Sequence, residues 1–245
     1  MASDKKVFIY MLTAEEDSIT DTELDMLSSA LPTALSQRCE AANAKELRHD
    51  RILAYTALMY ALYEAGHDPD AVGFSFSELG KPSIPDSDYK VSMSHAGGIG
   101  IAAISCDLDL GIDIELLNER AASTLQRVCK RFIPDFYPEP SALTDFIFDG
   151  EPSFAPDLEV KLYELIPKRL EGRLYFEKST ARCCTGLESS KAEKWTCAEA
   201  LLKLDGRGFT ALPQLSSIRD SAHLYSTAVK PHGKSSLLAV SLATK

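Results

Sequence analysis

The chain has 245 residues, of which 45% are hydrophobic and 25% are charged. This composition is typical of a globular protein and excludes collagen-like, coiled-coil and fully disordered chains. The length predicts one large domain or two small ones, with a core that needs no disulfide or metal. A formal net charge of −10 argues against a general nucleic-acid-binding protein, which needs clustered cations to contact phosphates.

Cysteine spacing and hydropathy limit the other classes. The six cysteines contain no CxxC pair, so we expect reduced thiols rather than a disulfide scaffold or a zinc site. Nowhere do about 18 apolar residues run together, so no transmembrane helix is expected. The apolar run Val7–Leu12 is too short for a signal peptide. We therefore expect a cytoplasmic protein with no membrane partner.

The first half of the chain mixes helical and strand patterns. Val7–Leu12 is short, apolar and partly β-branched, as a buried strand would be. In chain order the pattern then predicts helices over Thr20–Leu35 and Asn43–Ala65 and strands over Phe74–Phe76, Lys90–His95, Ile99–Cys106 and Leu110–Leu116. Pro32 weakens the first helix, and Gly66 ends the second.

The second half repeats the order of helix and strands. The pattern predicts a helix over Ala121–Phe132, a proline-broken insertion over 134–190 with a short helix near Leu158–Leu165, a helix over Glu193–Leu204, and a closing hairpin of Tyr225–Val229 and Ser236–Leu242. We therefore expect an α+β fold that is pseudo-duplicated. Its halves, residues 1–117 and 118–245, would each have a small antiparallel sheet packed on a long helix.

Two carboxylates lie two positions apart on one predicted strand. Asp113 and Glu115 project from one face, and Ile112, Ile114 and Leu116 from the other. Paired acids repel unless a cation lies between them, and their oxygens suit Mg²⁺. A solvated strand face would show the same alternation, so both interpretations stay open.

Two further patterns each have a functional and a structural interpretation. Glu199 and Lys203 lie four apart on a predicted helix, either as an exposed ion pair or as a metal carboxylate beside a phosphate-binding lysine. Ser94-His95 precedes Ala96-Gly97-Gly98, where glycines would let a ligand approach the backbone. A structural histidine is the alternative there.

A basic set in the first half could bind an anion. Its members are Arg38, Lys45, Arg48, Arg51 and Lys81. Arginine binds phosphate through two parallel hydrogen bonds. The alternative is a surface helix whose charges only keep it solvated.

The order of these blocks resembles one family. Gly80-Lys81-Pro82, Ser94-His95, Gly-Ile-Asp-Ile-Glu at 111–115, and Trp-Thr-Cys-Ala-Glu-Ala at 195–200 with Lys203 and Gly206-Arg207-Gly208 occur in that sequence. Together they resemble the 4'-phosphopantetheinyl transferase superfamily, in its larger, pseudodimeric, surfactin-synthetase-activating type. The matched blocks run from Gly80 to Gly208.

The resemblance implies an enzyme that transfers the 4'-phosphopantetheine arm of coenzyme A to a serine of an apo acyl or peptidyl carrier protein. Adenosine 3',5'-bisphosphate would be released. The implied cofactor is Mg²⁺, with coenzyme A as co-substrate. Such enzymes act in fatty-acid and secondary-metabolite biosynthesis, and an internal duplication would make a monomer sufficient. The active site would lie in the cleft between the halves.

The resemblance also implies a role for each matched residue. Asp113, Glu115 and Glu199 would hold Mg²⁺, and Glu199 would act as base on the carrier serine. Lys203 would contact the phosphate under attack. The residues implied for coenzyme A binding are Arg38, Arg51, Lys81, Pro82, Ser94, His95 and Lys203.

The chain departs from the family pattern at two points. Position 198 is alanine where the family usually has lysine, and Lys194 or Arg207 are candidates to replace that charge. The spacing from Glu115 to Glu199 is also unusually long, with the excess in 134–190, a region that receives the carrier protein in the family.

Two other functions remain open from the sequence. One is an Mg²⁺-dependent phosphohydrolase that uses the carboxylates with water as nucleophile. The other is a non-catalytic relative that only binds coenzyme A or a carrier protein, an interpretation motivated by Ala198 and the insertion.

Overall fold

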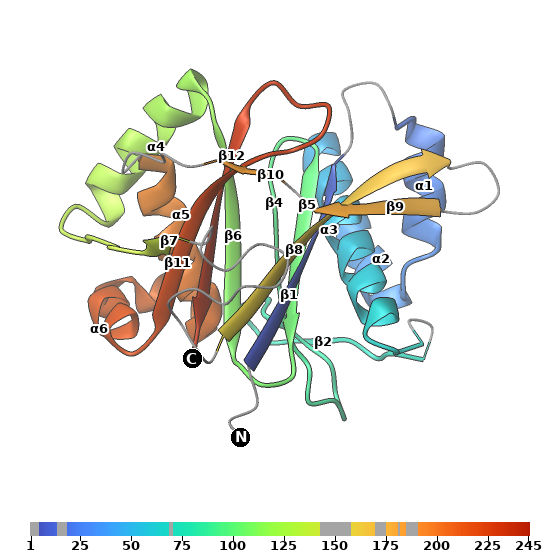
Figure 1. Ribbon diagram of the computed structural model, residues 1–245, viewed down its shortest axis with the longest axis horizontal. Coiled ribbons are helices and arrows are strands. Elements are labelled where there is room, and N and C mark those ends of the chain that lie inside the picture. The colour runs from blue at the N-terminus through green and yellow to red at the C-terminus, as the bar shows by residue number, and fades with distance from the viewer. Residues whose placement is uncertain are drawn as a thin grey trace.

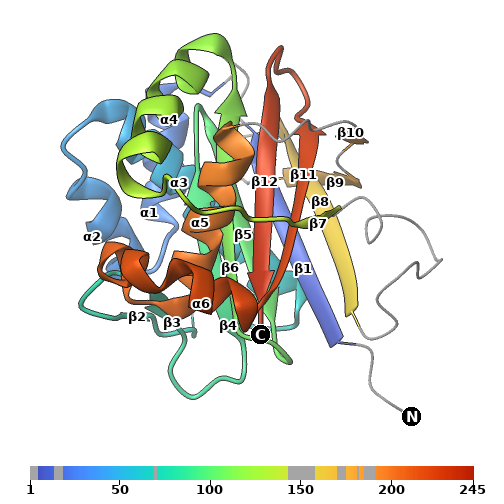
Figure 2. The same cartoon turned by 90° about the vertical axis from the view of Figure 1, so that its left-hand side faces the viewer.

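The computed structural model describes residues 5–13, 19–68, 71–142, 158–169, 175–180, 182–184 and 191–245. It has an α+β fold, as the sequence predicts. In Figure 1 the strands occupy the centre, with helices α1–α3 on one side and α4–α6 on the other. Figure 2 turns the same arrangement so that α4–α6 face the viewer.

The first sheet has the strand order β4-β5-β1-β8-β9. Its strands are β1 (Lys5–Thr13), β4 (Lys90–His95), β5 (Ile99–Ser105), β8 (Leu158–Arg169) and β9 (Tyr175–Thr180). β1 pairs antiparallel with β5 and parallel with β8. The strand prediction for Val7–Leu12 and the hairpin of β4 and β5 are confirmed.

The second sheet has the order β10-β11-β12-β6, and β7 pairs with β11. Its strands are β6 (Leu110–Leu117), β7 (Ser141–Ala142), β10 (Arg182–Cys184), β11 (His223–Lys230) and β12 (Leu237–Thr244). The predicted closing hairpin is therefore confirmed. A short ribbon of β2 (Ser75–Phe76) and β3 (Pro82–Ser83) stands apart from both sheets.

Four hydrophobic clusters of buried residues hold the layers together in the described part of the chain. Alternate residues of β1 take opposite sides: Ile9 packs between the two sheets, and Leu12 packs towards the helices α1–α3. The third cluster lies under α5 and includes Leu201 and Leu215. Each sheet is therefore covered on both faces, which explains the nearly continuous apolar runs in β1 and β5.

Helix α3 (Lys45–Glu64) is the long helix predicted for 43–65. Gly66 ends it with φ +87°, and the N–H of His67 donates to the carbonyl of Leu62. This is the left-handed termination that glycine favours. α5 (Lys191–Asp205) and α4 (Glu119–Phe132) also match their predicted ranges closely.

One predicted helix is divided in two, and another predicted helix is wrong. The single helix expected over Thr20–Leu35 is two helices, α1 (Asp21–Ser29) and α2 (Thr33–Glu40), because Pro32 begins α2 instead of interrupting a longer helix. The short helix expected near Leu158–Leu165 is strand β8. Leu158, Val160 and Leu162 alternate with polar residues and pack between the sheets, which is a strand pattern.

The rest of the predicted insertion lies largely outside the described residues. Of the range 134–190, the structure describes 134–142, 158–169, 175–180 and 182–184. β8 from the second half of the chain joins the first sheet beside β1. The division into residues 1–117 and 118–245 stays a prediction, as does the pseudo-duplication. None of the helices in the described ranges is long and apolar enough to span a bilayer.

Candidate functional site

A glycine at each of two positions lets a helix approach a strand closely. A Cβ at Gly111 on β6 would lie 2.1 Å from the carbonyl oxygen of Ala200 and 2.4 Å from the nitrogen of Leu204 on α5. A Cβ at Gly100 on β5 would lie 2.1 Å from the nitrogen of Ala54 on α3. Only glycine allows this contact, so Gly111 places the end of α5 directly over β6.

A cavity of about 340 Å³ lies where α3, α5, β4 and the β2–β3 ribbon meet. Most of the predicted site residues line it: Arg38, Arg51, Lys81, Pro82, His95, Glu199 and Lys203. They come from five separate segments of the chain. The lining also includes the aromatic side chains of Tyr55, Phe76 and Phe209.

Ser94 and Asp113 lie behind this lining. The hydroxyl of Ser94 and the ammonium of Lys203 both donate to Oδ1 of Asp113, each at 2.7 Å. Asp113 is buried, with 8% of its side chain exposed, whereas 29% of Lys203 is exposed. Lys203 therefore connects the buried carboxylate to the cavity.

The β4–β6 contact fixes this arrangement. β4 and β6 belong to different sheets, yet the N–H of Ile112 donates to the hydroxyl of Ser92 at 3.1 Å. The bond from Ser94 to Asp113 lies next to it along the same two strands. The serines of β4 thus hold β6 in register beside the cavity.

The three predicted metal carboxylates influence one another. Burial, and then the charge of Asp113, raise the pKa of Glu115. Burial, followed by the charges of Asp113 and Glu115, raises the pKa of Glu199 to about 7, against the opposing effect of Lys203. The site therefore carries more negative charge than Lys203 offsets.

No three His, Cys, Asp or Glu side chains in the described ranges are grouped closely enough to form a metal site. Asp113 instead bonds to Lys203 and Ser94. The chemistry of the donor set nevertheless fits a hard divalent cation. Neighbouring carboxylates repel one another, and a cation bound between them would relieve that repulsion.

His95 lies among cations. Burial, then the charges of Lys203 and Arg51, lower the pKa of its imidazole to about 4. The imidazole is therefore neutral at pH 7 and can donate one hydrogen bond. A histidine whose charge is opposed by neighbouring cations is suited to an anionic ligand, which would relieve that repulsion.

Asp50 supports the turn after His95. Its carboxylate accepts a hydrogen bond of 2.8 Å from the N–H of Gly98, and lies 3.9 Å from Nδ1 of His95. Burial raises the pKa of Asp50. Asp50 was not predicted from the sequence, because its partner Gly98 is 48 positions away.

Arg38 and Arg51 lie close together on the other wall. The guanidinium of Arg38 stacks over the ring of Phe76, 4.1 Å from its centroid, and Arg51 donates to the backbone carbonyl of Arg38 at 2.9 Å. Arg38 also bonds to the hydroxyl of Tyr55, whose pKa burial raises. Neither Tyr55 nor Phe76 was predicted as a site residue. Their aromatic character is the only signal for them in the sequence.

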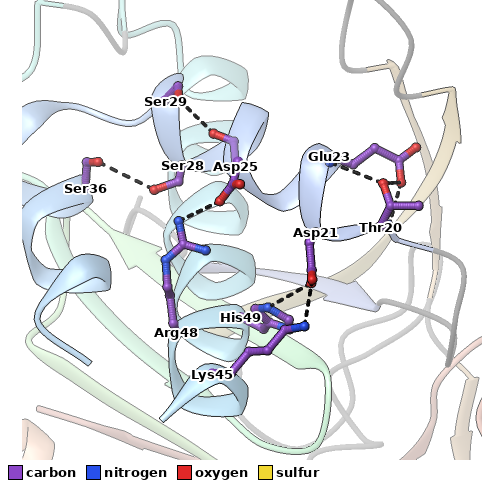
Figure 3. Close-up of polar contacts among 10 residues, drawn as sticks. All are labelled: Thr20, Asp21, Glu23, Asp25, Ser28, Ser29, Ser36, Lys45, Arg48 and His49. Carbon is purple, nitrogen blue, oxygen red and sulfur yellow. Dashed lines mark hydrogen bonds and ion pairs between the residues drawn. The ribbon is translucent and has the colours of Figure 1, made fainter. Parts of the chain in front are cut away.

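Two members of the predicted basic set do not reach the cavity. Lys45 pairs with Asp21 at 2.7 Å and Arg48 pairs with Asp25 at 2.8 Å, so both join α3 to α1 (Figure 3). The N-terminus of α1 is closed by the reciprocal hydrogen bonds of Thr20 and Glu23. These two cations therefore stabilise helix packing.

Position 198 points away from the cavity. Ala198 is fully buried in the hydrophobic cluster under α5. The two proposed replacements have other partners: Lys194 donates to the carbonyl of Pro134, and Arg207 pairs with Asp205. The idea that either one replaces a cation at the cavity is not supported by these contacts.

Comparison with known proteins finds a similarity to a curated enzyme. No family model matches the chain. The chain is similar to the curated protein 4'-phosphopantetheinyl transferase HetI of Nostoc sp., with 25% identity over 154 residues. The match covers 61% of this chain and 48% of that relative, so the chain spans about half the relative's length. This similarity supports an assignment to the phosphopantetheinyl transferase superfamily.

Proposed function

We propose that this protein is a 4'-phosphopantetheinyl transferase of the pseudodimeric type. It transfers the 4'-phosphopantetheine arm of coenzyme A to a serine of an apo acyl or peptidyl carrier protein and releases adenosine 3',5'-bisphosphate. The observation that carries the proposal is the convergence on one cavity of residues from motifs that are far apart in the sequence. The similarity to the Nostoc enzyme is an independent support.

The cations of the cavity suit the anionic groups of coenzyme A. Arg38, Arg51 and neutral His95 would bind the 3'-phosphate, with Ser94 positioning Asp113 behind them. The adenine would lie against the wall of the cavity that carries Pro82 and the stacked Phe76–Arg38 pair. Aromatic and guanidinium planes are favourable surfaces for a purine.

The carboxylates would serve the reaction itself. Asp113, Glu115 and Glu199 would hold Mg²⁺, which offsets the negative charge of the pyrophosphate when bound. Glu199 would accept the proton of the carrier serine as its oxygen attacks the phosphorus bearing the pantetheine arm. The bond to the leaving phosphate breaks, and adenosine 3',5'-bisphosphate keeps that electron pair. Lys203 would stabilise the phosphate under attack.

Two features support the pseudodimeric subtype. The order β4-β5-β1 in the first sheet parallels the order β11-β12-β6 in the second, and both sets pair antiparallel throughout. A long helix, α3 or α5, covers each set. Cytoplasmic location, a monomeric state and a role in fatty-acid or secondary-metabolite biosynthesis stay predictions.

The test is intact-mass spectrometry of a panel of apo carrier proteins, incubated with the protein, coenzyme A and Mg²⁺. We expect a mass gain of one phosphopantetheine arm, which needs Mg²⁺ and falls by about 100-fold or more in Glu199→Gln. Release of free phosphopantetheine without a carrier would favour the phosphohydrolase. Binding of coenzyme A without any mass gain would favour the non-catalytic relative.

A further inference from the structure

Lys81 lies at the boundary between two cavities. Besides the cavity described above, a second one of about 590 Å³ lies on the other side of the β2–β3 ribbon, next to Tyr89 and Lys90. Phe76, Lys81, Pro82 and Gly206 line both cavities. The side chain of Lys81 therefore crosses from the ribbon to the end of α5.

The ammonium of Lys81 has a specific partner on α5. It donates a hydrogen bond of 2.7 Å to the backbone carbonyl of Leu204 in the last turn of α5. The last carbonyls of a helix have no N–H donor within the helix, and a cation near this end is favourable. This bond satisfies such a group and joins segments 123 positions apart.

The backbone on both sides is shaped for this contact. The turn before Lys81 is closed by the N–H of Gly80, which donates to the carbonyl of Ser77, and the N–H of Lys81 donates to the hydroxyl of Ser77. On the other side, Gly206 has φ +83°, and a Cβ there would lie 3.1 Å from Cδ of Lys81. Glycine leaves room for the lysine side chain to pass.

The bond lies next to the reactive residues. Lys203 immediately precedes Leu204, and Glu199 is one helical turn earlier on the same helix. The opposite wall of the cavity carries Phe76 and Pro82, which belong to the same ribbon as Lys81. A contact between Lys81 and Leu204 therefore sets the distance between the two walls.

We infer that Lys81 is a positioning residue, whose ammonium ties the β2–β3 ribbon to the end of α5 and so orients Lys203 and Glu199 towards the bound ligand. This inference rests on the proposed function, and it replaces the coenzyme A-binding role that the resemblance implies for Lys81. The acids near Lys81 are Asp109 and Asp205, and Lys90 is the other nearby cation. Neither acid takes the hydrogen bond that Leu204 accepts.

The experiment compares Lys81→Met with the matched control Lys90→Met, an exposed lysine that lines only the second cavity. Hydrogen exchange of the amides at 202–208 is measured without ligand. The Kd for adenosine 3',5'-bisphosphate and the kcat for carrier modification are then measured. We expect exchange about tenfold faster in Lys81→Met, since the last turn loses its tie. We expect kcat to fall about tenfold or more, with Kd changed less than about threefold.

The outcomes separate the alternatives. Unchanged exchange in Lys81→Met, or a Kd raised more than about tenfold with kcat preserved, would overturn the inference and make Lys81 a ligand contact. An equal effect of Lys90→Met would also overturn it, because a general loss of charge would then explain the result. If the unmodified protein acts on no carrier, the proposed function fails, and the exchange data alone decide whether Lys81 ties the ribbon to α5.

Discussion

Lys203 on α5 and Asp113 on β6 form a 2.7 Å ion pair across 90 positions of the sequence. The pair joins the helix that carries Glu199 to the strand that carries Glu115. Because Asp113 is buried, its charge depends on Lys203 and on the hydroxyl of Ser94 for compensation. This pair thus contributes both to the stability of the fold and to the charge of the site.

Removal of Lys203 should destabilise the protein. Lys203→Met leaves Asp113 buried with one hydrogen bond, and we expect the free energy of unfolding to fall by about 1–3 kcal/mol in urea titration. The control is Lys194→Met, whose lysine donates to the carbonyl of Pro134 on the surface. An equal loss in both variants would contradict the proposed importance of the buried pair.

Gly111→Ala should separate α5 from β6. The added methyl group would overlap the backbone at Ala200 and Leu204, so we expect a loss of about 1–3 kcal/mol in the free energy of unfolding. Gly73→Ala is the matched control, because a Cβ at Gly73 meets nothing within 4 Å and Gly73 has no left-handed backbone conformation. Equal stability of the two variants would show that α5 does not need this close approach.

Ala198→Lys should not improve the site. The side chain at 198 enters the buried cluster under α5, so a lysine there would place a charge in an apolar environment. We expect a loss of about 2 kcal/mol or more in urea titration and no gain in carrier modification. Ala41→Lys, at an exposed helix end, is the control. A stable Ala198→Lys with raised activity would contradict the buried placement.

Glu199 should make stability depend on pH when no divalent cation is present. Its pKa of about 7 in the folded protein is above the ordinary 4.5, so the folded state holds a proton that the unfolded state releases. The stabilising contribution is complete below about pH 4.5 and is lost as the pH rises through 7. Urea titrations in chelator from pH 5 to 8 should show this fall, and Glu199→Gln should lack it. A pH profile unaltered by the substitution would refute the assignment.

His95 should titrate near pH 4 in the free protein, because burial and the cations Lys203 and Arg51 disfavour its charged form. An NMR titration of the histidine Cε1–H signals measures this, with His95→Gln identifying the signal. Addition of adenosine 3',5'-bisphosphate should raise the pKa of His95, since the phosphate offsets the neighbouring cations. A pKa near 6.5 in the free protein, or no change on addition of the nucleotide, would argue against an anion at this position.

Much of the fold follows from local sequence pattern. The period of two in β6 assigns Ile112 and Ile114 to the core and Asp113 to the other face, and the structure confirms this. Helix α3 and its end at Gly66 follow from the helical spacing and from glycine's access to positive φ. Such features depend on residues that are near neighbours in the chain, so the sequence alone determines them.

Tertiary structure decided the features that join distant segments. β8 was predicted as a helix, although Leu158, Val160 and Leu162 alternate, because its parallel pairing with β1 joins residues 153 positions apart, such as Lys5 and Leu158 (158 − 5). For the same reason, the contact of Asp50 with the turn after His95 and the bond from Lys81 to Leu204 were not predicted. The burial of Ala198 likewise depends on which face of α5 meets the second sheet. The sequence determined which chemical groups are present and their local geometry, and long-range packing determined which of them share one cavity.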